Sequence, residues 1–406
     1  MCNDAGIKYT IVSAVIFVVL VLVAFVILVL FKPVSPVLLT QTFTPTNVTL
    51  KAVTVIFQHG ASAPEEFLSD DYDWSESFPN GECALTDLGF RESFKLGQYL
   101  RERYVKTGFL KSPLFAPEVY FRSRASDRCL QSAALVGSAM WAMNEHDEYK
   151  AVPVFSEEND DTLLTHMQNC VAETRRIREA CGRLPTHDLK WSDFGGFIHE
   201  CLGFHHESVL SSAEVFSEAM AYTHMDYHHL PVPNWFRSNK RAIYSIIDRV
   251  YSYIVGVNDY HDIDLLRVKQ GYFLYTITED LWKQWIDYEQ TGKIRKKFRA
   301  YVTDNWLMLA FLHALGCGTS ALGKSLPRNN PLIMIELYQG SGKPLVKVFY
   351  KDDTMDVPKD VTSDVRDCSF AHCHLVEFVI RPRFYKTNDS EKACFDTAKT
   401  RPKRKP

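Results

Sequence analysis

Near the start of the chain lies a long hydrophobic run rather than a periodic pattern. Residues 11–31 contain only Ser13 as a polar side chain, and a helix of that length spans about 30 Å, the thickness of the hydrocarbon core of a bilayer. A cleaved signal peptide has a shorter apolar region and a small-residue cleavage site, whereas this run exits through FKPVSP. We therefore predict a transmembrane signal anchor at 11–31, preceded by a cytosolic tail at 1–10.

Residues 32–50, after the anchor, are rich in Thr, Pro and Val, which is typical of an extended stalk. The positive charges that flank the anchor are balanced, so they do not set its orientation. Glycosylation acceptor patterns at Asn47 and Asn388, together with ten cysteines, favour a luminal or extracellular body. The sequence thus predicts a single-pass membrane protein whose C-terminal domain is luminal or extracellular. It leaves open which membrane is used and whether the anchor is cleaved.

Strand and helix patterns alternate in the body of the chain. The β-branched apolar run 51–57 predicts a buried strand, and 118–121 predicts a second. Amphipathic helices are predicted over 86–104, with Thr86 as the N-cap, and over 127–143. This order of elements predicts a mostly parallel sheet covered by helices.

The rest of the body contains two further patterns. Residues 145–292 have little strand signal and long amphipathic runs, which predict a helical insertion beside the sheet. Residues 299–318 predict a strand, a polar tip and a helix that ends at Gly316. Two apolar strands within 331–350 are joined by QGSGK, whose glycines permit the tight turn of a hairpin.

The composition fits one large folded body at 51–395. With 46% hydrophobic and 13% aromatic residues, the chain can build a sizeable core and does not have a disordered composition. The formal net charge of −3 neither favours nor excludes an anionic partner. The basic tail at 396–406 is short and has no interleaved aromatic residues, so we expect no nucleic-acid partner.

Three polar loops follow predicted strands. They are QHGASAP (58–64), RSRASDR (122–128) and VTDN (302–305). Ligands bind beyond the carboxyl ends of the strands in open parallel sheets, so we expect these loops to meet and to form a site around His59. Taken alone, His59 is better explained as a loop histidine whose ring packs under the glycine turn.

A metal site is the alternative that the segment HECLGFHHE (199–207) suggests. His199 and Glu200 begin like a zincin helix motif, but Gly203 stands where the second histidine ligand belongs. The cysteines also occur singly rather than in CxxC pairs. We therefore expect neither a metal nor a cofactor, and we assign these histidines to the surface of the helical insertion.

Several longer motifs resemble the histidine acid phosphatases, the branch that contains the prostatic and lysosomal enzymes. LTDLGFRESFKLGQYLRERY, FRS…DRCLQSA and LIMIELY…LVKVFY occur in the order and spacing of that family. The resemblance extends from about Lys51 to Cys394. It implies a phosphoglycerate-mutase-like α/β fold, a three-layer α/β/α core with an α-helical cap at about 145–292. The family often pairs through sheet edges, so a homodimer is one outcome for the oligomeric state, which stays open.

The same resemblance implies two disulfides. They are Cys170–Cys394 and Cys368–Cys373, the second of which is spaced one residue more widely than in the family. Cysteines in apolar helical runs, such as Cys129 and Cys317, are explained instead as buried free thiols.

The family's chemistry implies a role for each polar loop. Its first motif is Arg-His-Gly-x-Arg-x-Pro, in which the histidine attacks phosphorus and becomes a phosphohistidine that water hydrolyses. The two arginines of that motif and a third from an Arg-Ser-Thr segment bind the phosphoryl oxygens. A late His-Asp pair supplies a phosphate-binding histidine and the general acid.

This sequence keeps the family's nucleophile, as His59, and its third arginine, as Arg122. An extra arginine, Arg124, could face the same way on an extended loop. Arg122 could instead be structural and pair with Asp304 or Asp127. An Arg122–Asp304 ion pair would neutralise the site.

The other charged positions are replaced. Gln58 and Ser62 stand where the family has its first two arginines, and Asp304 and Asn305 stand where it has the His-Asp pair. Loss of one preorganised donor typically lowers the rate by ~10²–10³, and loss of a general acid lowers it by a further ~10²–10⁴. Asp304 could serve as the acid only if the loop shifted.

The sequence therefore predicts a membrane-anchored histidine acid phosphatase-like protein that is a catalytically impaired pseudophosphatase and acts as a binding or interaction domain. The alternative is an acid phosphatase that hydrolyses phosphate monoesters through a phosphohistidine at His59. The expected partners are the membrane and either a phosphate monoester or an unknown luminal or extracellular ligand.

Overall fold

The computed structural model describes most of the predicted body. The described residues are 48–68, 72–142, 151–157, 161–165, 170–186, 189–340, 343–368 and 372–396. The predicted cytosolic tail and anchor, and nearly all of the stalk and the basic tail, lie outside them. Within the described ranges, no helix is both long enough and apolar enough to cross a membrane.

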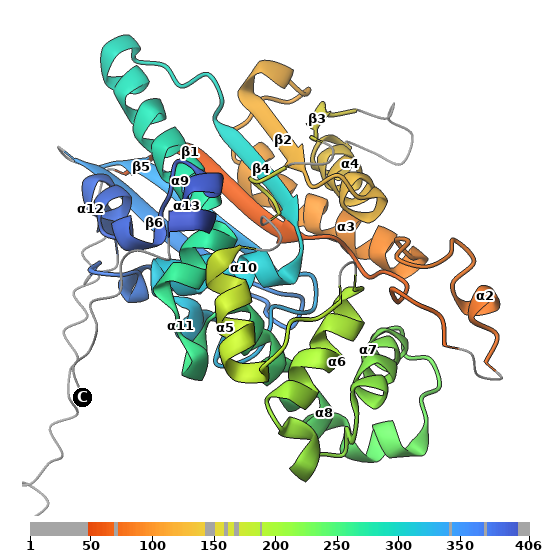
Figure 1. The fold of residues 1–406 in the computed structure, drawn as a ribbon. Helices are drawn as coiled ribbons and strands as arrows, with labels where there is room; N and C mark the ends of the chain where they lie inside the picture. The colour runs from red at the N-terminus through yellow and green to blue at the C-terminus, as the bar shows by residue number, and fades with distance from the viewer. Residues whose placement is uncertain are drawn as a thin grey trace, which may run out of the picture. The chain divides into compact units, whose positions relative to one another are not determined.

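A mixed β-sheet forms the centre of the body (Figure 1). Its strands lie in the order β3-β2-β4-β1-β5-β6-β7, and β8 pairs with β6. Strands β1 to β4 are parallel, whereas β5 to β8 run antiparallel to their neighbours. The prediction of a mostly parallel sheet is therefore right only for the half that carries the three polar loops. The strands are β1 (Thr49–Gln58), β2 (Val119–Ser123), β3 (Val154–Phe155), β4 (Phe298–Thr303), β5 (Leu332–Gln339), β6 (Pro344–Lys351), β7 (Lys359–Asp360) and β8 (Cys373–His374).

Alternate residues of β1 face two hydrophobic cores, one on each side of the sheet. Val53, Val55 and Phe57 belong to a core shared with helices α3 and α4. Ala52 and Ile56 belong to a second core shared with α8, α9 and α10. Successive side chains of a strand point to opposite faces, so this buried strand supports helices on both sides. The result is a mixed α/β fold with a central sheet and many helices.

The helices begin and end close to the predicted residues. Thr86 caps α3 by accepting a hydrogen bond from the Gly89 N–H at 3.3 Å, and Gly316 ends α10 with a φ of 97°. The α-helices are α2 (Trp74–Ser77), α3 (Asp87–Leu100), α4 (Asp127–Trp141), α5 (Val171–Cys181), α6 (Trp191–Cys201), α7 (Ala213–Tyr227), α8 (Asn234–Val255), α9 (Ile263–Thr291), α10 (Asn305–Leu315), α11 (Gly318–Leu322), α12 (Leu375–Ile380) and α13 (Ser390–Asp396). A π-helical turn, Arg101–Val105, continues α3. The predicted hairpin is β5–β6, in which Gln339 lies opposite Pro344.

Helices α5 to α9 lie between β3 and β4 in the chain, within the range predicted as a helical insertion. Figure 1 shows α6, α7 and α8 gathered beside the sheet. Helix α9 packs on the sheet itself, since Phe273 meets Tyr301 of β4 with ring centroids 5.3 Å apart. Part of the predicted insertion is thus a layer of the core.

Three disulfides join described cysteines. They are Cys170–Cys394, Cys368–Cys373 and Cys181–Cys201. The first two confirm the expected pairs, and the third was not predicted. Cys129 and Cys317 are buried free thiols, as expected, and Cys83 is a half-buried free thiol.

Candidate functional site

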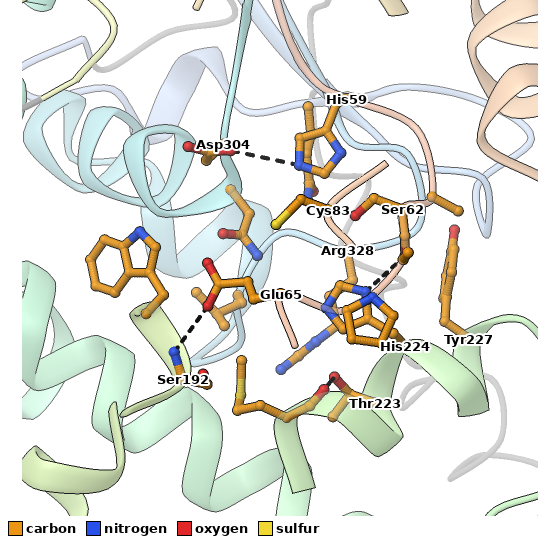
Figure 2. A pocket seen from close by; sticks show the side chains of 18 of the residues that line it. His59, Ser62, Glu65, Cys83, Ser192, Thr223, His224, Tyr227, Asp304 and Arg328 are labelled. Carbon is orange, nitrogen blue, oxygen red and sulfur yellow. Dashed lines mark hydrogen bonds and ion pairs between the residues drawn. The ribbon is translucent and has the colours of Figure 1, made fainter. Parts of the chain in front are cut away.

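The three polar loops meet at neighbouring strand ends. Gln58, at the end of β1, lies in register with Thr303 of β4, and Ser123 of β2 lies in register with Val302. A cavity of about 240 Å³ opens beside these ends and extends between α6, α7, α8 and the start of α10. Figure 2 shows the side chains of some of the residues that line it. The prediction that these loops converge is confirmed.

The ring of His59 has a partner at each nitrogen. Its Nδ1 lies 2.8 Å from the carbonyl oxygen of Gly60, and its Nε2 accepts a hydrogen bond from Nε of Arg128 at 3.0 Å. A carbonyl can only accept and a guanidinium can only donate, so Nδ1 carries the proton and Nε2 carries the lone pair. Burial, and then the charge of Arg128, lower the pKa of His59 to about 3. The ring is therefore neutral in mildly acidic and neutral solution.

Gly60 fixes this loop against helix α3. A Cβ atom at this position would lie only 2.3 Å from the carbonyl oxygen of Gly89, so no larger residue fits without moving the backbone. The backbone N–H of Gly60 donates to Ser132 Oγ at 3.1 Å, and that of Ala61 donates to Glu92 Oε2 at 2.8 Å. Glu92 also accepts from the Tyr227 hydroxyl at 2.6 Å, and burial raises its pKa.

Asp304 is the centre of a charge cluster next to His59. Its Oδ1 lies 3.6 Å from His59 Nε2 and 3.6 Å from Arg128 Nη2. Its Oδ2 forms an ion pair with Nη1 of Arg124. The side chain of Asp304 is only 10% exposed, so these charges interact with little screening by water.

Arg122, the arginine kept from the family pattern, lies outside the cavity wall. Its Nη2 pairs with Glu157 at 2.8 Å and with Asp161 at 3.0 Å. The expected Arg122–Asp304 ion pair is therefore wrong, and Arg124 takes that place. The cause is the register of β3, in which Phe155 pairs with Arg122 and brings the following acidic residues within reach of its guanidinium.

The structure brings together five of the six residues predicted for the site. The five that line the cavity are Gln58, His59, Ser62, Asp304 and Asn305. Asn305 is the first residue of α10. The backbone oxygen of Ser62 lies 2.9 Å from Nδ1 of His224 (Figure 2), and burial is the main cause that lowers the pKa of His224 to about 4.

Several residues of the site were not predicted. Arg128 follows Arg122 by six residues, in the first turn of a predicted helix and inside the FRS…DRCLQSA motif, so that motif was the signal for it. No local pattern marked Glu92 or His224 as parts of the cavity wall, because they come from distant segments. Glu65 was also missed, although it directly follows the predicted loop 58–64.

The histidines of the segment 199–207 take no part in this cavity. His199 is fully buried, so the expectation of a surface position is wrong for this residue, and its Nε2 lies 2.7 Å from the carbonyl oxygen of Leu210. In the part of the chain that the structure describes, no group of three His, Cys, Asp or Glu side chains is arranged to hold a metal ion.

Comparison with known proteins agrees with this architecture. The sequence profile described as the histidine phosphatase superfamily (branch 2) matches residues 45–351. A Caenorhabditis briggsae protein named "Putative acid phosphatase 1" is 28% identical over 368 residues, which cover 86% of this chain and 83% of that protein. The lysosomal acid phosphatase of Bos taurus is 25% identical over 340 residues, which cover 82% of this chain and 77% of the bovine protein.

A solved structure shares the fold at lower sequence identity. The Hafnia alvei phytase in complex with myo-inositol hexakis sulphate superposes with a TM-score of 0.59 at 14% identity, over 86% of this chain and 99% of the phytase chain. At that identity the likeness concerns the fold alone. The profile match over most of the body, with the acid phosphatases among its relatives, leads to the conclusion that the chain belongs to the histidine acid phosphatase family, in branch 2 of the histidine phosphatase superfamily.

Proposed function

We propose that this protein is a membrane-anchored pseudophosphatase, which keeps the phosphatase scaffold as a binding domain and hydrolyses phosphate monoesters poorly or not at all. The observation that carries the proposal is the position of Asp304. Its carboxylate lies 3.6 Å from the Nε2 atom of His59, the ring nitrogen that carries the lone pair.

The negative charge of Asp304 disfavours the binding of a phosphate monoester next to Nε2 of His59. Two unit charges of the same sign that are 4 Å apart repel by about 4 kcal/mol at an effective dielectric constant of 20. Gln58 and Ser62 supply no positive charge to offset this repulsion, and Arg122 is held by two carboxylates away from the cavity. The two guanidinium groups that are near, those of Arg124 and Arg128, are already engaged by Asp304. Asn305 replaces the general acid, and an amide does not donate a proton to a leaving alkoxide.

The proposal includes the finer features of the fold and the location. We propose a phosphoglycerate-mutase-like core with a cap formed by the helices between β3 and β4, and an anchor at 11–31 that leaves the body luminal or extracellular. Disulfides persist in oxidising compartments, and three are formed in the body. Asn388 is exposed, as a glycosylation acceptor must be.

One observation favours the second candidate, an acid phosphatase that uses His59. The hydrogen bond between Nδ1 and Gly60 leaves Nε2 as the nitrogen with the lone pair, which is the form that a phosphorus nucleophile requires. In the second candidate, a substrate would have to displace Arg128 and Asp304 from this atom.

Hydrolysis of an aryl phosphate by the full chain in detergent, from acidic to neutral pH, separates the two candidates. The pseudophosphatase proposal predicts no turnover above that of the His59→Ala variant. A turnover that His59→Ala abolishes, with a phosphohistidine trapped at residue 59, would establish the acid phosphatase instead.

A further inference from the structure

Three aromatic side chains form what we call the aromatic wall of the cavity. It consists of Trp191 at the start of α6, Tyr251 of α8 and Trp306 of α10, all of which line the cavity. The rings of Trp191 and Tyr251 stack with centroids 5.9 Å apart, and those of Trp191 and Trp306 lie 6.3 Å apart. The faces of aromatic rings carry partial negative charge and attract cations.

Most charges in the cavity wall are balanced by a neighbouring side chain. Asp304 pairs with Arg124, as described above, and Glu66 pairs with Lys190 at 3.0 Å. On the positive side, Arg328 is paired with Asp248 at 2.7 Å. Neither histidine in the wall adds a positive charge at neutral pH, since the pKa values of both are lowered.

Two carboxylates of this wall form no ion pair among the described residues: Glu92, which accepts hydrogen bonds from the Ala61 N–H and the Tyr227 hydroxyl, and Glu65. The Oε2 atom of Glu65 accepts a hydrogen bond from the backbone N–H of Ser192 at 3.1 Å (Figure 2). Because Ser192 directly follows Trp191 in the chain, this bond places the carboxylate next to the aromatic wall.

Among the described residues, no Lys or Arg forms an ion pair with Glu65, and the nearby charge of Arg124, which interacts with Glu65, is paired with Asp304. Glu65 and Tyr251 both line the cavity. Burial raises the pKa of Tyr251, the charge of Glu65 adds to this effect, and the charge of Arg328 opposes it.

We propose that this cavity binds a small organic cation of the ammonium class, with its charged group between Glu65 and the aromatic wall. The inference rests on the proposed function, because a site that has lost its phosphate-binding charges is free to take a ligand of the opposite sign. A carboxylate without a cationic partner and a set of ring faces are the features that recognise ammonium groups. In a largely apolar cavity, a small number of converging polar groups is enough to orient such a ligand.

Calorimetric titration of the full chain with choline in an amine-free buffer tests this inference. The matched neutral probe is 3,3-dimethylbutanol, in which carbon replaces the quaternary nitrogen. We expect choline to bind at least about tenfold more tightly than the neutral probe, a difference of about 1.4 kcal/mol. Equal affinity for the two probes would overturn the inference. So would the absence of detectable choline binding at roughly 10 mM, which we take as the weakest affinity that would still be meaningful.

Two variants locate the cation within the cavity. Glu65→Gln removes the carboxylate charge that forms no ion pair but keeps an acceptor for the Ser192 N–H, and we expect it to weaken choline binding about tenfold. Glu66→Gln is the matched control, because Glu66 also lines the cavity but is balanced by Lys190, and we expect little change. If both variants bind choline as the unchanged chain does, Glu65 does not recognise the ligand and the inference fails. Circular dichroism of each variant shows whether it has folded, and the comparison of choline with the neutral probe does not depend on any variant.

The hydrolysis assay keeps this inference separate from the proposed function. Binding of choline together with rapid aryl phosphate turnover would overturn the pseudophosphatase proposal and leave the cation site standing. Absence of both choline binding and turnover would overturn the cation site alone.

Discussion

The guanidinium of Arg128 donates a hydrogen bond from Nε to Nε2 of His59 across 3.0 Å. The acceptor is the nitrogen that would attack phosphorus in the chemistry of this family. Its lone pair is already engaged by a positively charged donor, and it is therefore less available to any electrophile. Under the proposed function, this relationship explains how His59 can persist in the sequence without being ready to react.

Replacement of Arg128 by Gln is expected to make His59 more reactive. A hydrogen bond to a charged group contributes about 1.5–3 kcal/mol, so its loss should speed the acylation of His59 by diethyl pyrocarbonate about tenfold or more. The modification is measured at residue 59 by mass spectrometry. Arg124→Gln is the control, because it removes the same charge from the cluster without touching the His59 ring. Equal rates in the two variants would show that the hydrogen bond does not restrain Nε2.

Replacement of Asp304 by Asn is expected to create an oxyanion site. The two guanidinium groups that now contact Asp304, those of Arg124 and Arg128, would lose their anionic partner and become free for phosphate or vanadate. Since each charged hydrogen bond contributes about 1.5–3 kcal/mol, we expect vanadate to bind at least about tenfold more tightly than to the unchanged chain. Calorimetry measures this, with Glu66→Gln as a variant of equal net charge. Unchanged vanadate binding by Asp304→Asn would mean that the carboxylate is not what excludes the anion.

Local patterns in the sequence were sufficient for much of the fold. The buried strand β1, the β5–β6 hairpin and the helix that ends at Gly316 each follow from a short stretch of residues whose own chemistry selects the conformation. Such patterns do not specify which strands become neighbours. The antiparallel position of β5 beside β1 depends on long-range packing, and the prediction of a mostly parallel sheet was therefore only half right.

The site was predictable where the family's motifs align and unpredictable where partners come from distant loops. Arg122 and Arg124 are two residues apart and equivalent in local pattern. The choice between them is made by Glu157 and Asp161, which lie 35 and 39 residues away from Arg122 in sequence. No short-range signal reports such a contact. The disulfide Cys181–Cys201 was missed for the same reason, because it depends on how α5 and α6 pack.

The lowered pKa values of two buried histidines predict a loss of stability in acid. In the unfolded chain a histidine titrates near its ordinary value of 6.5, whereas the pKa is about 3 for His59 and about 4 for His224. Between these values the unfolded chain binds more protons than the folded chain, so stability is fully present above pH 6.5 and falls as the pH is lowered. Each histidine contributes a slope on the order of 1 kcal/mol per pH unit. The raised pKa of Glu92 acts in the opposite direction and offsets part of this loss.

Denaturant unfolding of the full chain measures this slope. We would compare roughly pH 6.5 with roughly pH 4.5, because both values lie between the folded and unfolded pKa values of the two histidines. His224→Gln keeps a donor for the Ser62 oxygen and removes one titrating group, so we expect it to lose less stability between the two pH values than the unchanged chain loses. An equal loss in both proteins would contradict the assignment of His224 as a neutral, buried ring.

Restoring the family's residues is expected to recover phosphatase activity only in part. The four replacements are Gln58→Arg, Ser62→Arg, Asp304→His and Asn305→Asp. Because one preorganised donor changes the rate by ~10²–10³, we expect kcat/KM for an aryl phosphate to rise at least about 10²-fold. A variant that carries the same four replacements and also His59→Ala should show no gain. That result would tie the activity to the phosphohistidine.

The recovery is expected to stay incomplete because Arg122 remains bound to Glu157 and Asp161. Adding Glu157→Gln and Asp161→Asn releases that guanidinium, and Asn keeps the side-chain oxygen that now accepts from the Leu163 N–H. We therefore expect a further rise in kcat/KM when these two changes are added to the four. A variant with all six changes that binds vanadate but does not hydrolyse the ester would show that the backbone of the loops, and not only their side chains, has moved away from a catalytic arrangement.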